Sequence, residues 1–499
     1  MSREIWCTEK SQLLKTADNR IPVLNDIKDY ISSLPHDEAK ETTTLLQLPL
    51  VFDCLNDSSD EQIELACEVL TVCLSTLDLG DGTSHFFTDL GRALNHPHAQ
   101  VKIMALNEIL RDSKFIFNKI SLVNFKTLYG YVVKCIGDEN LSVATVACDV
   151  VSEICKTPQG INLLISQEVN PILVEVTSSN EMNRIRFHQV VINIAKISPD
   201  LAIEMEKNGF LRDVIDELNS KDVLVQLNII ELLSTFAEME HGCTYLENCK
   251  VLSKLCDSLQ DTENVVYLQL CEPGILKFFG HIAHQNPDIL IETYPFVLNH
   301  LFMNLNSNDN TTLGVTLNTL SYIVDTDESK LKIDRIGVNL YKSITKIVEG
   351  LGVFPNDIKV KALHCLANFL NVNGSDRNVT ETTRKWYGFM TENPMDWIMR
   401  YAKNPFNELK MGGLVVLGSL SKQYWGHEVM RNTPGLIEFL MDRNIETIKE
   451  CKVLKYDIVK KLAESPSFNH EMQKSMKVFV NEGPFYVQGV TEIALEGDD

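Results

Sequence analysis

The sequence predicts an all-α fold in which pairs of helices stack side by side into a curved solenoid. Three observations predict it. The chain has 499 residues, more than the roughly 250–300 at which a single core stops growing. It contains only 24 Gly and 16 Pro, too few for an all-β chain full of tight turns. One helical phrase also recurs along it at a nearly constant interval, which is typical of repeat proteins.

The recurring phrase is a short polar turn followed by a helix with apolar or small residues at positions i, i+4 and i+8. Its clearest copies begin at Val101, Val143, Ile185 and Val225, with intervals of 42, 42 and 40 residues. Further copies begin at Ile275, Leu313, Ile358 and Leu409. A period of about 40–47 residues belongs to HEAT and armadillo repeats. The predicted fold is therefore a HEAT/armadillo-type α-solenoid.

The middle position of the phrase is small in several copies, because a small residue lets a neighbouring helix approach closely. Those residues are Ala105, Ala147, Ala362 and Gly413. The helix that precedes each phrase is expected in segments such as Ile161–Thr177 and Val251–Leu259, which are amphipathic. Each repeat is then a helix pair that buries its faces only by stacking on its neighbours.

Five segments are expected along the chain. Residues 1–90 are predicted to hold degenerate N-terminal helical repeats, 91–370 the regular repeats, 371–384 a loop, 385–480 the C-terminal repeats, and 481–499 a C-terminal tail. No linker rich in Pro, Ser or Gly separates them. A single array is therefore favoured, with two independent α-helical domains as the alternative.

The charge balance points to the kind of partner. The chain has 68 acidic and 46 basic residues, for a formal net charge of −22, which repels phosphate backbones and anionic lipid headgroups. Nucleic acid and membranes are not expected partners. A basic protein surface is expected, and the alternative is that the acidity serves solubility alone. The N-terminal MSREIWCTEKSQLLKT has no apolar signal region, so the protein is expected in the cytoplasm and also in the nucleus.

Motifs that carry chemistry are missing from the sequence. It has no P-loop, no G-x-G-x-x-G after a strand, no H-E-x-x-H and no G-x-S-x-G. His96 with His98, and His281 with His284, lack the third ligand that a protein metal site needs. The thirteen cysteines form no C-x-x-C pair. We therefore expect no enzyme, no cofactor and no metal.

One polar row is the candidate partner-binding surface. If i, i+4 and i+8 face the core, positions i+6 and i+10 lie away from it, because successive residues turn by about 100° around a helix. Val191 with Ala195, and Val415 with Ser419, interrupt the row. A solvated face without a partner is the alternative. The row consists of Asn107, Arg111, Asp149, Glu153, Glu231, Thr235, His281, Gln285, His364 and Asn368.

Four stretches of the sequence resemble a known family. They are HPHAQVKIMALNEI (96–109), CIGDENLSVATVA (135–147), EPGILKFFGHIA (272–283) and NEGPFYVQ (481–488). In order and spacing, from about residue 90 onward, they are similar to the 26S proteasome non-ATPase regulatory subunit 5 family of regulatory-particle base assembly chaperones. The resemblance implies an α-solenoid that binds the C-terminal domain of one proteasomal AAA ATPase subunit, together with other base subunits. It also implies that the protein delays docking on the core particle and has no catalytic activity, nucleotide or metal of its own.

Two other functions remain open. The alternative is a general α-solenoid scaffold or transport adaptor for protein cargo. Importin-α-like adaptors have Trp-x-x-x-Asn pairs, but the residues four positions after Trp386, Trp397 and Trp425 are not asparagines. Recognition of nuclear signals is therefore not predicted. An enzyme ranks third. The free protein is expected to be a monomer.

Overall fold

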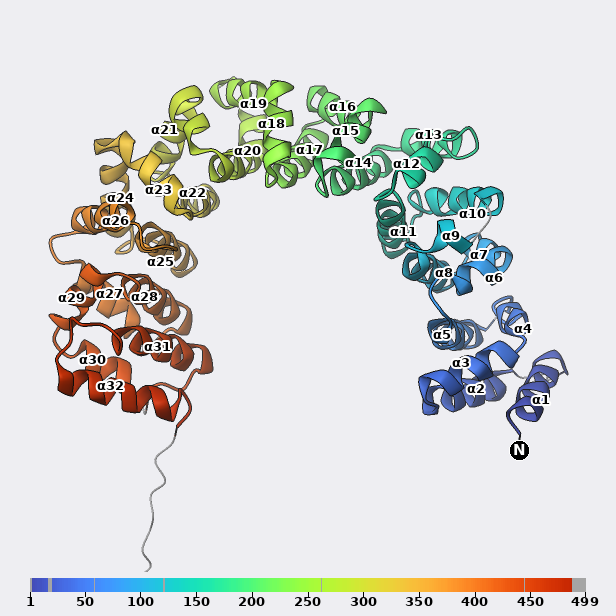
Figure 1. Cartoon of the computed structure of the whole chain (residues 1–499). Coiled ribbons are helices and arrows are strands. Elements are labelled where there is room, and N and C mark those ends of the chain that lie inside the picture. Colours follow the sequence, from blue (N-terminus) through green and yellow to red (C-terminus); the bar gives the residue numbers. More distant parts are fainter. Residues whose placement is uncertain are drawn as a thin grey trace, which may run out of the picture. The chain divides into compact units, whose positions relative to one another are not determined.

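The computed structural model describes residues 2–16, 20–57, 59–119, 122–261, 263–443 and 445–486, and within them every regular element is a helix (Figure 1). The chain divides into two compact units, Met1–Leu232 and Leu233–Asp499. The boundary falls inside helix α17 (Val223–Phe236), so no linker separates the units.

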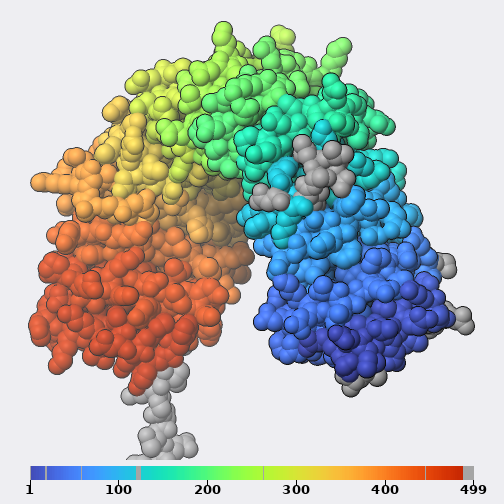
Figure 2. Space-filling model, turned by 45° about the vertical axis from the view of Figure 1, so that its right-hand side comes forward, coloured from blue at the N-terminus to red at the C-terminus, as the bar shows by residue number. Residues whose placement is uncertain are grey.

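Unit 1 is built from helices in two layers. Helices α2, α5, α8, α11 and α14 pack on one another in succession and form the first layer, while α7, α10 and α13 form a second layer against it. In Figure 1 the first layer lies on the concave side of unit 1, and in Figure 2 the surface of this unit runs from blue to green in sequence order. The elements are α1 (Arg3–Thr16), α2 (Ile21–Ser33), α3 (His36–Leu45), α4 (Leu48–Asp53), α5 (Asp60–Thr76), α6 (Asp81–His85), α7 (Phe87–Leu94), α8 (Ala99–Asp112), α9 (Ile116–Lys119), α10 (Leu122–Cys135), α11 (Leu141–Ile154), α12 (Pro158–Leu164), α13 (Asn170–Ser179), α14 (Glu181–Ala195), α15 (Pro199–Lys207), α16 (Phe210–Asp216), the 3₁₀ helix η1 (Glu217–Asn219) and the start of α17.

Unit 2 repeats this architecture. Helices α20, α22, α25, α28 and α31 pack in succession as its first layer, and α19, α21, α24 and α26 follow one another in the second. Its elements after α17 are α18 (Glu240–Asn248), α19 (Val251–Gln260), α20 (Val265–Gln285), the π-helix η2 (Ile289–Thr293), α21 (Pro295–Asn304), α22 (Asn310–Ile323), α23 (Asp327–Ile333), the 3₁₀ helix η3 (Asp334–Ile336), α24 (Val338–Gly350), α25 (Asn356–Leu370), α26 (Arg377–Met390), α27 (Pro394–Ala402), α28 (Asn407–Leu420), α29 (Tyr424–Arg431), α30 (Leu436–Met441), α31 (Lys449–Leu462) and α32 (His470–Glu482).

In some copies of the repeated phrase, the polar turn supplies a side-chain N-cap for the helix that follows. Asn140 accepts hydrogen bonds from the backbone N–H groups of Ser142 and Val143 at the start of α11. Asn180 does the same for Asn183 in α14. These bonds satisfy backbone donors that have no partner inside the helix. In these two copies the turn therefore fixes where the first-layer helix begins.

The small middle residue does allow close packing, as the sequence predicts. Ala105, Ala147 and Ala362 are fully buried. A Cβ atom added to Gly413 of α28 would lie only 2.6 Å from the carbonyl carbon of Tyr401 in α27. Helix α28 thus rests on the backbone of α27, and no larger side chain fits between them.

The predicted loop over residues 371–384 is wrong in its second half, because α26 begins at Arg377. Asp376 caps this helix by accepting a hydrogen bond from Asn378 N–H, and Val379 and Trp386 are buried. The segment looked like a loop because polar residues fill most of its positions. Val379 and Trp386 are seven residues apart in α26, so they lie on the same helical face.

Two expectations about single helices had different outcomes. The segment Val251–Leu259 is helical, as α19. The segment Ile161–Thr177 is not one helix, since α12 ends at Leu164 and α13 begins at Asn170. Pro171 stands in the first turn of α13, where its missing N–H is tolerated, and it could not continue an earlier helix without breaking it.

The phrase placed at Ile185 is shifted by two residues. Ile185 is half-buried, whereas Asn183, Phe187 and Val191 are buried in α14. The phrase therefore begins at Asn183, and its core positions include a polar residue that hid the register. With this correction the interruption of the polar row at Val191 and Ala195 has a simple cause, because both residues belong to the core.

The last helix of the chain extends slightly into the segment predicted as a C-terminal tail. Helix α32 ends at Glu482, inside the segment predicted as a tail, and residues 487–499 lie outside the described part of the chain. Trp386, Trp397 and Trp425 are buried, as core tryptophans should be. No helix in the described ranges is both long and apolar enough to cross a membrane. The division into degenerate, regular and C-terminal repeats remains a prediction.

Candidate partner-binding surface

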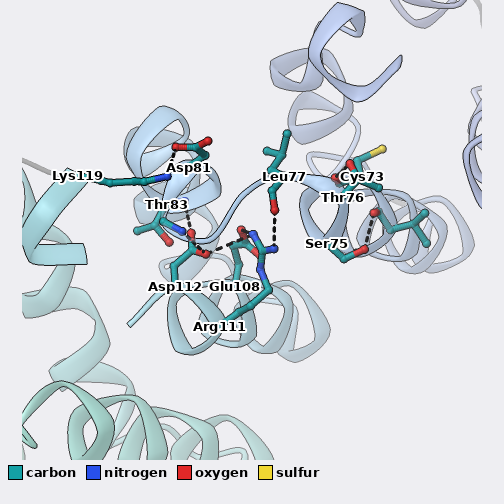
Figure 3. Close-up of polar contacts among 12 residues, drawn as sticks. Cys73, Ser75, Thr76, Leu77, Asp81, Thr83, Glu108, Arg111, Asp112 and Lys119 are labelled. Atoms are coloured by element: carbon teal, nitrogen blue, oxygen red, sulfur yellow. Dashed lines mark hydrogen bonds and ion pairs between the residues drawn. The ribbon is translucent and has the colours of Figure 1, made fainter. Parts of the chain in front are cut away.

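The predicted polar row begins on α8 with Asn107 and Arg111, which differ in what their side chains do. Asn107 is exposed to solvent. Arg111 is half-buried, and its guanidinium group donates to both carboxylate oxygens of Glu108, at 3.0 and 2.6 Å. It also donates to the carbonyl oxygen of Leu77 at 3.1 Å (Figure 3). Arg111 therefore fastens the end of the α5 helix to α8, and its contact with a partner remains a prediction.

A buried carboxylate completes this cluster beneath Arg111. Asp112 is fully buried and accepts 2.8 Å hydrogen bonds from the backbone N–H groups of Gly80 and Thr83 (Figure 3). Its Oδ1 atom lies 3.3 Å from Nη2 of Arg111. Burial raises the pKa of Glu108, while Arg111 acts in the opposite direction. The cluster holds α6 against α8, so its charges act within the fold.

On α11 the row carries two carboxylates. Asp149 is exposed, yet the protein around it removes enough water to raise the pKa of its carboxyl group. Glu153 is half-buried and forms an ion pair with Lys156 one turn away. Asp149 is therefore the member of this pair whose charge is presented to solvent.

The corrected register of α14 adds two residues that the sequence prediction missed. With the phrase starting at Asn183, positions i+6 and i+10 are Gln189 and Asn193, which are half-buried. Gln189 Nε2 donates a 2.8 Å hydrogen bond to Asn193 Oδ1. The signal that could have located them is the N-cap at Asn180, which fixes the start of the helix.

The next members of the row, Glu231 and Thr235, lie one turn apart on α17. Both are half-buried. The boundary between the units separates them, with Glu231 in unit 1 and Thr235 in unit 2. The row therefore has one part in each unit.

In unit 2, His281 and Gln285 of α20 contact neighbouring groups. The Nδ1 atom of His281 lies 3.9 Å from Oε1 of Glu238, and its ring packs edge-on against Tyr322 with centroids 4.9 Å apart. Gln285 Nε2 donates a 2.6 Å hydrogen bond to the Glu238 carbonyl oxygen. His284 stacks on the same Tyr322 ring at 4.2 Å. These histidines pack against an aromatic ring between α20 and α22.

The last two members, His364 and Asn368, lie on α25. His364 is exposed, and loss of water around its ring lowers its pKa. Asn368 Nδ2 donates a 2.9 Å hydrogen bond to the hydroxyl oxygen of Ser321 on α22. Beyond α25, the interruption predicted at Val415 and Ser419 is present, because Val415 is half-buried and Ser419 buried.

The arrangement suits non-covalent contact with another protein. Its solvent-exposed groups are two amides, a carboxylate and an imidazole, which belong to Asn107 on α8, Gln285 on α20, Asp149 on α11 and His364 on α25. Across the described ranges, no group of three or more His, Cys, Asp and Glu residues is placed to hold a metal ion. In each unit, the row offers hydrogen-bond donors and acceptors along a repeated surface of the kind that solenoids use for binding.

A comparison with known protein families shows the family to which the chain belongs. A family model described as "Proteasome non-ATPase 26S subunit" matches residues 3–499. The chain belongs to the proteasome non-ATPase 26S subunit family. The resemblance seen in the four sequence stretches is thereby confirmed, and it extends through the first 90 residues.

Individual relatives of this chain also match it along nearly its whole length. The 26S proteasome non-ATPase regulatory subunit 5 of Bos taurus is 28% identical over 481 residues, which is 95% of each chain. Its namesake in Homo sapiens is 27% identical with the same coverage. The one in Drosophila melanogaster is 26% identical over 511 residues, with 98% of each chain covered.

Solved structures confirm the fold alone. The crystal structure of Kap121p matches with a TM-score of 0.50 at 11% identity, covering 96% of this chain and 51% of that one. A mutant of Kap121p matches with a TM-score of 0.51 and the same identity and coverage. Together with the all-helical layers, these matches confirm the HEAT/armadillo-type solenoid for this member of the proteasome non-ATPase 26S subunit family.

Proposed function

We propose that this protein is a chaperone in assembly of the base of the 26S proteasome regulatory particle. In this role it binds the C-terminal domain of an AAA ATPase subunit and other base subunits, is a monomer when free, and delays docking of the base on the core particle. The observation that supports the proposal is the family match over residues 3–499, with relatives named as a non-ATPase regulatory subunit at nearly full length.

The binding surface in this proposal is the polar row of the first layer. In unit 1 it presents Asn107 and Asp149 to solvent, with Glu231 half-buried beyond them. The net charge of −22 favours encounter with a basic protein surface. Shape and charge, and no covalent chemistry, would then select the partner.

The proposed mechanism is steric. A chaperone that covers the C-terminal domain of an ATPase subunit keeps that domain from the core particle. Release requires only that the free energy of docking exceed that of the chaperone interface, because each 1.4 kcal/mol changes a binding constant about tenfold. No nucleotide or metal is needed in this scheme.

A pull-down from cell extract tests the proposal. Tagged full-length protein should recover base ATPase subunits without subunits of the core particle. Recovery of protein cargo together with a small GTPase would instead support a transport adaptor, and recovery of core particles together with the base would contradict the delay of docking.

A further inference from the structure

A pocket in unit 1, outside the polar row, has the features of a binding site. Helices α13, α14 and α16 and the 3₁₀ helix η1 surround it, and its volume is about 500 Å³. Ligand pockets in proteins are commonly about 300–1,000 Å³. Helices α13 and α16 both pack on α14, and they are neighbours in Figure 1. The wall contains carboxylates, two phenylalanine rings and one histidine.

The histidine is His188, and it lacks a hydrogen-bond partner. Its side chain lines the pocket but is only 4% exposed. Neither ring nitrogen has a partner, and Nε2 lies 3.9 Å from Oε1 of Glu217, beyond hydrogen-bond distance. Buried polar groups in proteins are normally hydrogen-bonded. A ring left without a partner at the wall of a pocket is therefore suited to bond with a molecule that enters it.

The carboxylates of the pocket outnumber its cations. Asp213, Asp216 and Glu217 line it, while Arg184 is the arginine in its wall. Arg184 Nε donates to Glu217 Oε1 at 2.6 Å, so its charge is directed to one carboxylate of the three. Partial burial, and then the neighbouring carboxylates, raise the pKa of Asp213. The two aspartates are exposed, and the exposed Arg212 stands next to Asp213 on the same helix.

The carboxylates and the imidazole add hydrogen-bond acceptors to the wall, beside amides and hydroxyls that both donate and accept, which belong to Asn170, Thr177, Asn219 and Ser220. Ionised carboxylates only accept hydrogen bonds, and a neutral imidazole offers one acceptor nitrogen. Burial holds the pKa of His188 at about 4, so its ring is neutral at neutral pH. A ligand rich in N–H donors and positively charged would complement this wall.

The aromatic rings of the pocket favour one kind of positively charged group as the ligand. Phe187 and Phe210 pack edge to face with centroids 5.3 Å apart, and both line the pocket. Aromatic faces attract cations, and the planar guanidinium group both stacks on rings and bridges carboxylates through its five donors. An ammonium group offers neither the stacking nor the fork geometry.

We propose that this pocket binds an arginine side chain from a basic segment of a partner protein. Asp213 and Asp216 would accept from the guanidinium group at the mouth, His188 would accept deeper in, and the two phenylalanine rings would flank the side chain. This site is separate from the polar row of the proposed chaperone surface, and it does not depend on which partner that surface binds.

The test uses a small probe and the full-length chain. The probe is the capped tripeptide acetyl-Gly-Arg-Gly-amide, and the matched probe carries citrulline, which has the same shape without the charge. Methyl NMR can follow Val174, which lines the pocket, is 55% exposed, and can be assigned with the Val174→Ala variant. The arginine probe should shift this resonance in a saturable way, and the citrulline probe should not.

Two double variants give the decisive comparison. Asp213→Asn with Asp216→Asn should weaken binding about tenfold or more, because hydrogen bonds to a charged group contribute on that scale. Both positions are exposed, so this variant is expected to fold. Glu4→Gln with Glu9→Gln removes the same charge from exposed positions on α1 and should leave binding unchanged. Absence of a saturable shift, equal binding of the citrulline probe, or equal losses in the two double variants would overturn the proposal.

Discussion

The ammonium group of Lys330 is fully buried and donates a 2.6 Å hydrogen bond to the backbone carbonyl oxygen of Val324, the residue that caps the C-terminus of α22. It also donates to the Asp325 carbonyl oxygen at 3.3 Å. A lysine on α23 thus satisfies carbonyl groups at the end of the preceding helix. Burial lowers the pKa of Lys330 to about 8, although Asp327 and Asp325 act in the opposite direction.

Lys330 should make the stability of unit 2 depend on alkaline pH. Between about pH 8 and the usual lysine pKa near 10.4, the unfolded chain binds a proton that the folded protein does not, so stability rises with pH. The contribution between pH 7 and pH 10 is about 2 kcal/mol. The check is urea unfolding of the wild type and of Lys330→Met at both pH values. From pH 7 to pH 10, the free energy of unfolding of the wild type should increase by about 2 kcal/mol relative to that of Lys330→Met. If the difference between the two proteins is the same at both pH values, the pKa of Lys330 is not lowered by burial.

Asp112 should be among the residues on which the fold of unit 1 depends most. In Asp112→Ala, the backbone N–H groups of Gly80 and Thr83 lose their acceptor, and each buried unpaired group costs about 1–3 kcal/mol. We expect a loss of about 2–5 kcal/mol in the free energy of unfolding. Lys119→Ala is the control, because it removes a partly exposed pair with Asp81 (Figure 3) worth less than about 1 kcal/mol. Equal losses of stability for Asp112→Ala and Lys119→Ala in thermal unfolding would contradict this prediction.

Charge reversal on α11 tests the proposed chaperone surface. The double variant Asp149→Lys with Glu153→Lys should slow capture of the ATPase C-terminal domain and reduce its dependence on salt, because steering by opposite charges acts on the association rate. The control, Glu4→Lys with Glu9→Lys, changes charge by the same amount on exposed positions of α1. Surface plasmon resonance at two salt concentrations measures both rates. Unchanged association with the first variant would mean that partners bind another face.

Periodicity predicted the fold class because it reports burial directly. Val101, Ala105 and Ile109 are all fully buried, as are Val143, Ala147 and Val151. Where a polar side chain occupies a core position, the same logic fails. Buried Asn183 moved the apparent start of its phrase to Ile185, and Gln189 and Asn193 were lost from the candidate row.

A helix that contains few apolar residues was also mispredicted, as a loop. Helix α26 buries Thr382 and Thr383 beside Trp386, and threonines read as loop residues when only polarity is counted. Thr383 Oγ1 instead donates a 2.6 Å hydrogen bond to Gln423 Oε1. A residue forty positions away thus satisfies this buried hydroxyl group, and local sequence does not reveal it.

The candidate site could be predicted only in part. Turn and helix signals located the exposed Asn107 and Asp149, but they did not show that Arg111 is bonded to Glu108 and Leu77. The arginine pocket was beyond reach, because His188 and Asp213 lie on different helices and meet only through packing. Pairings between helices depend on tertiary structure, so single-helix patterns do not contain them.

His188 supplies a second pH-dependent test, in the acidic range instead of the alkaline one. Its folded pKa of about 4 lies below the unfolded value near 6.5, so between these values the unfolded state binds the extra proton and stability falls as pH decreases. At pH 5 the loss relative to pH 7 is about 2 kcal/mol. His188→Gln removes this titration, so urea unfolding at pH 7 and pH 5 should show the wild type losing more stability than the variant. If the wild type and His188→Gln lose equal stability on acidification, the ring is not held neutral, and the acceptor role assigned to it in the pocket fails as well.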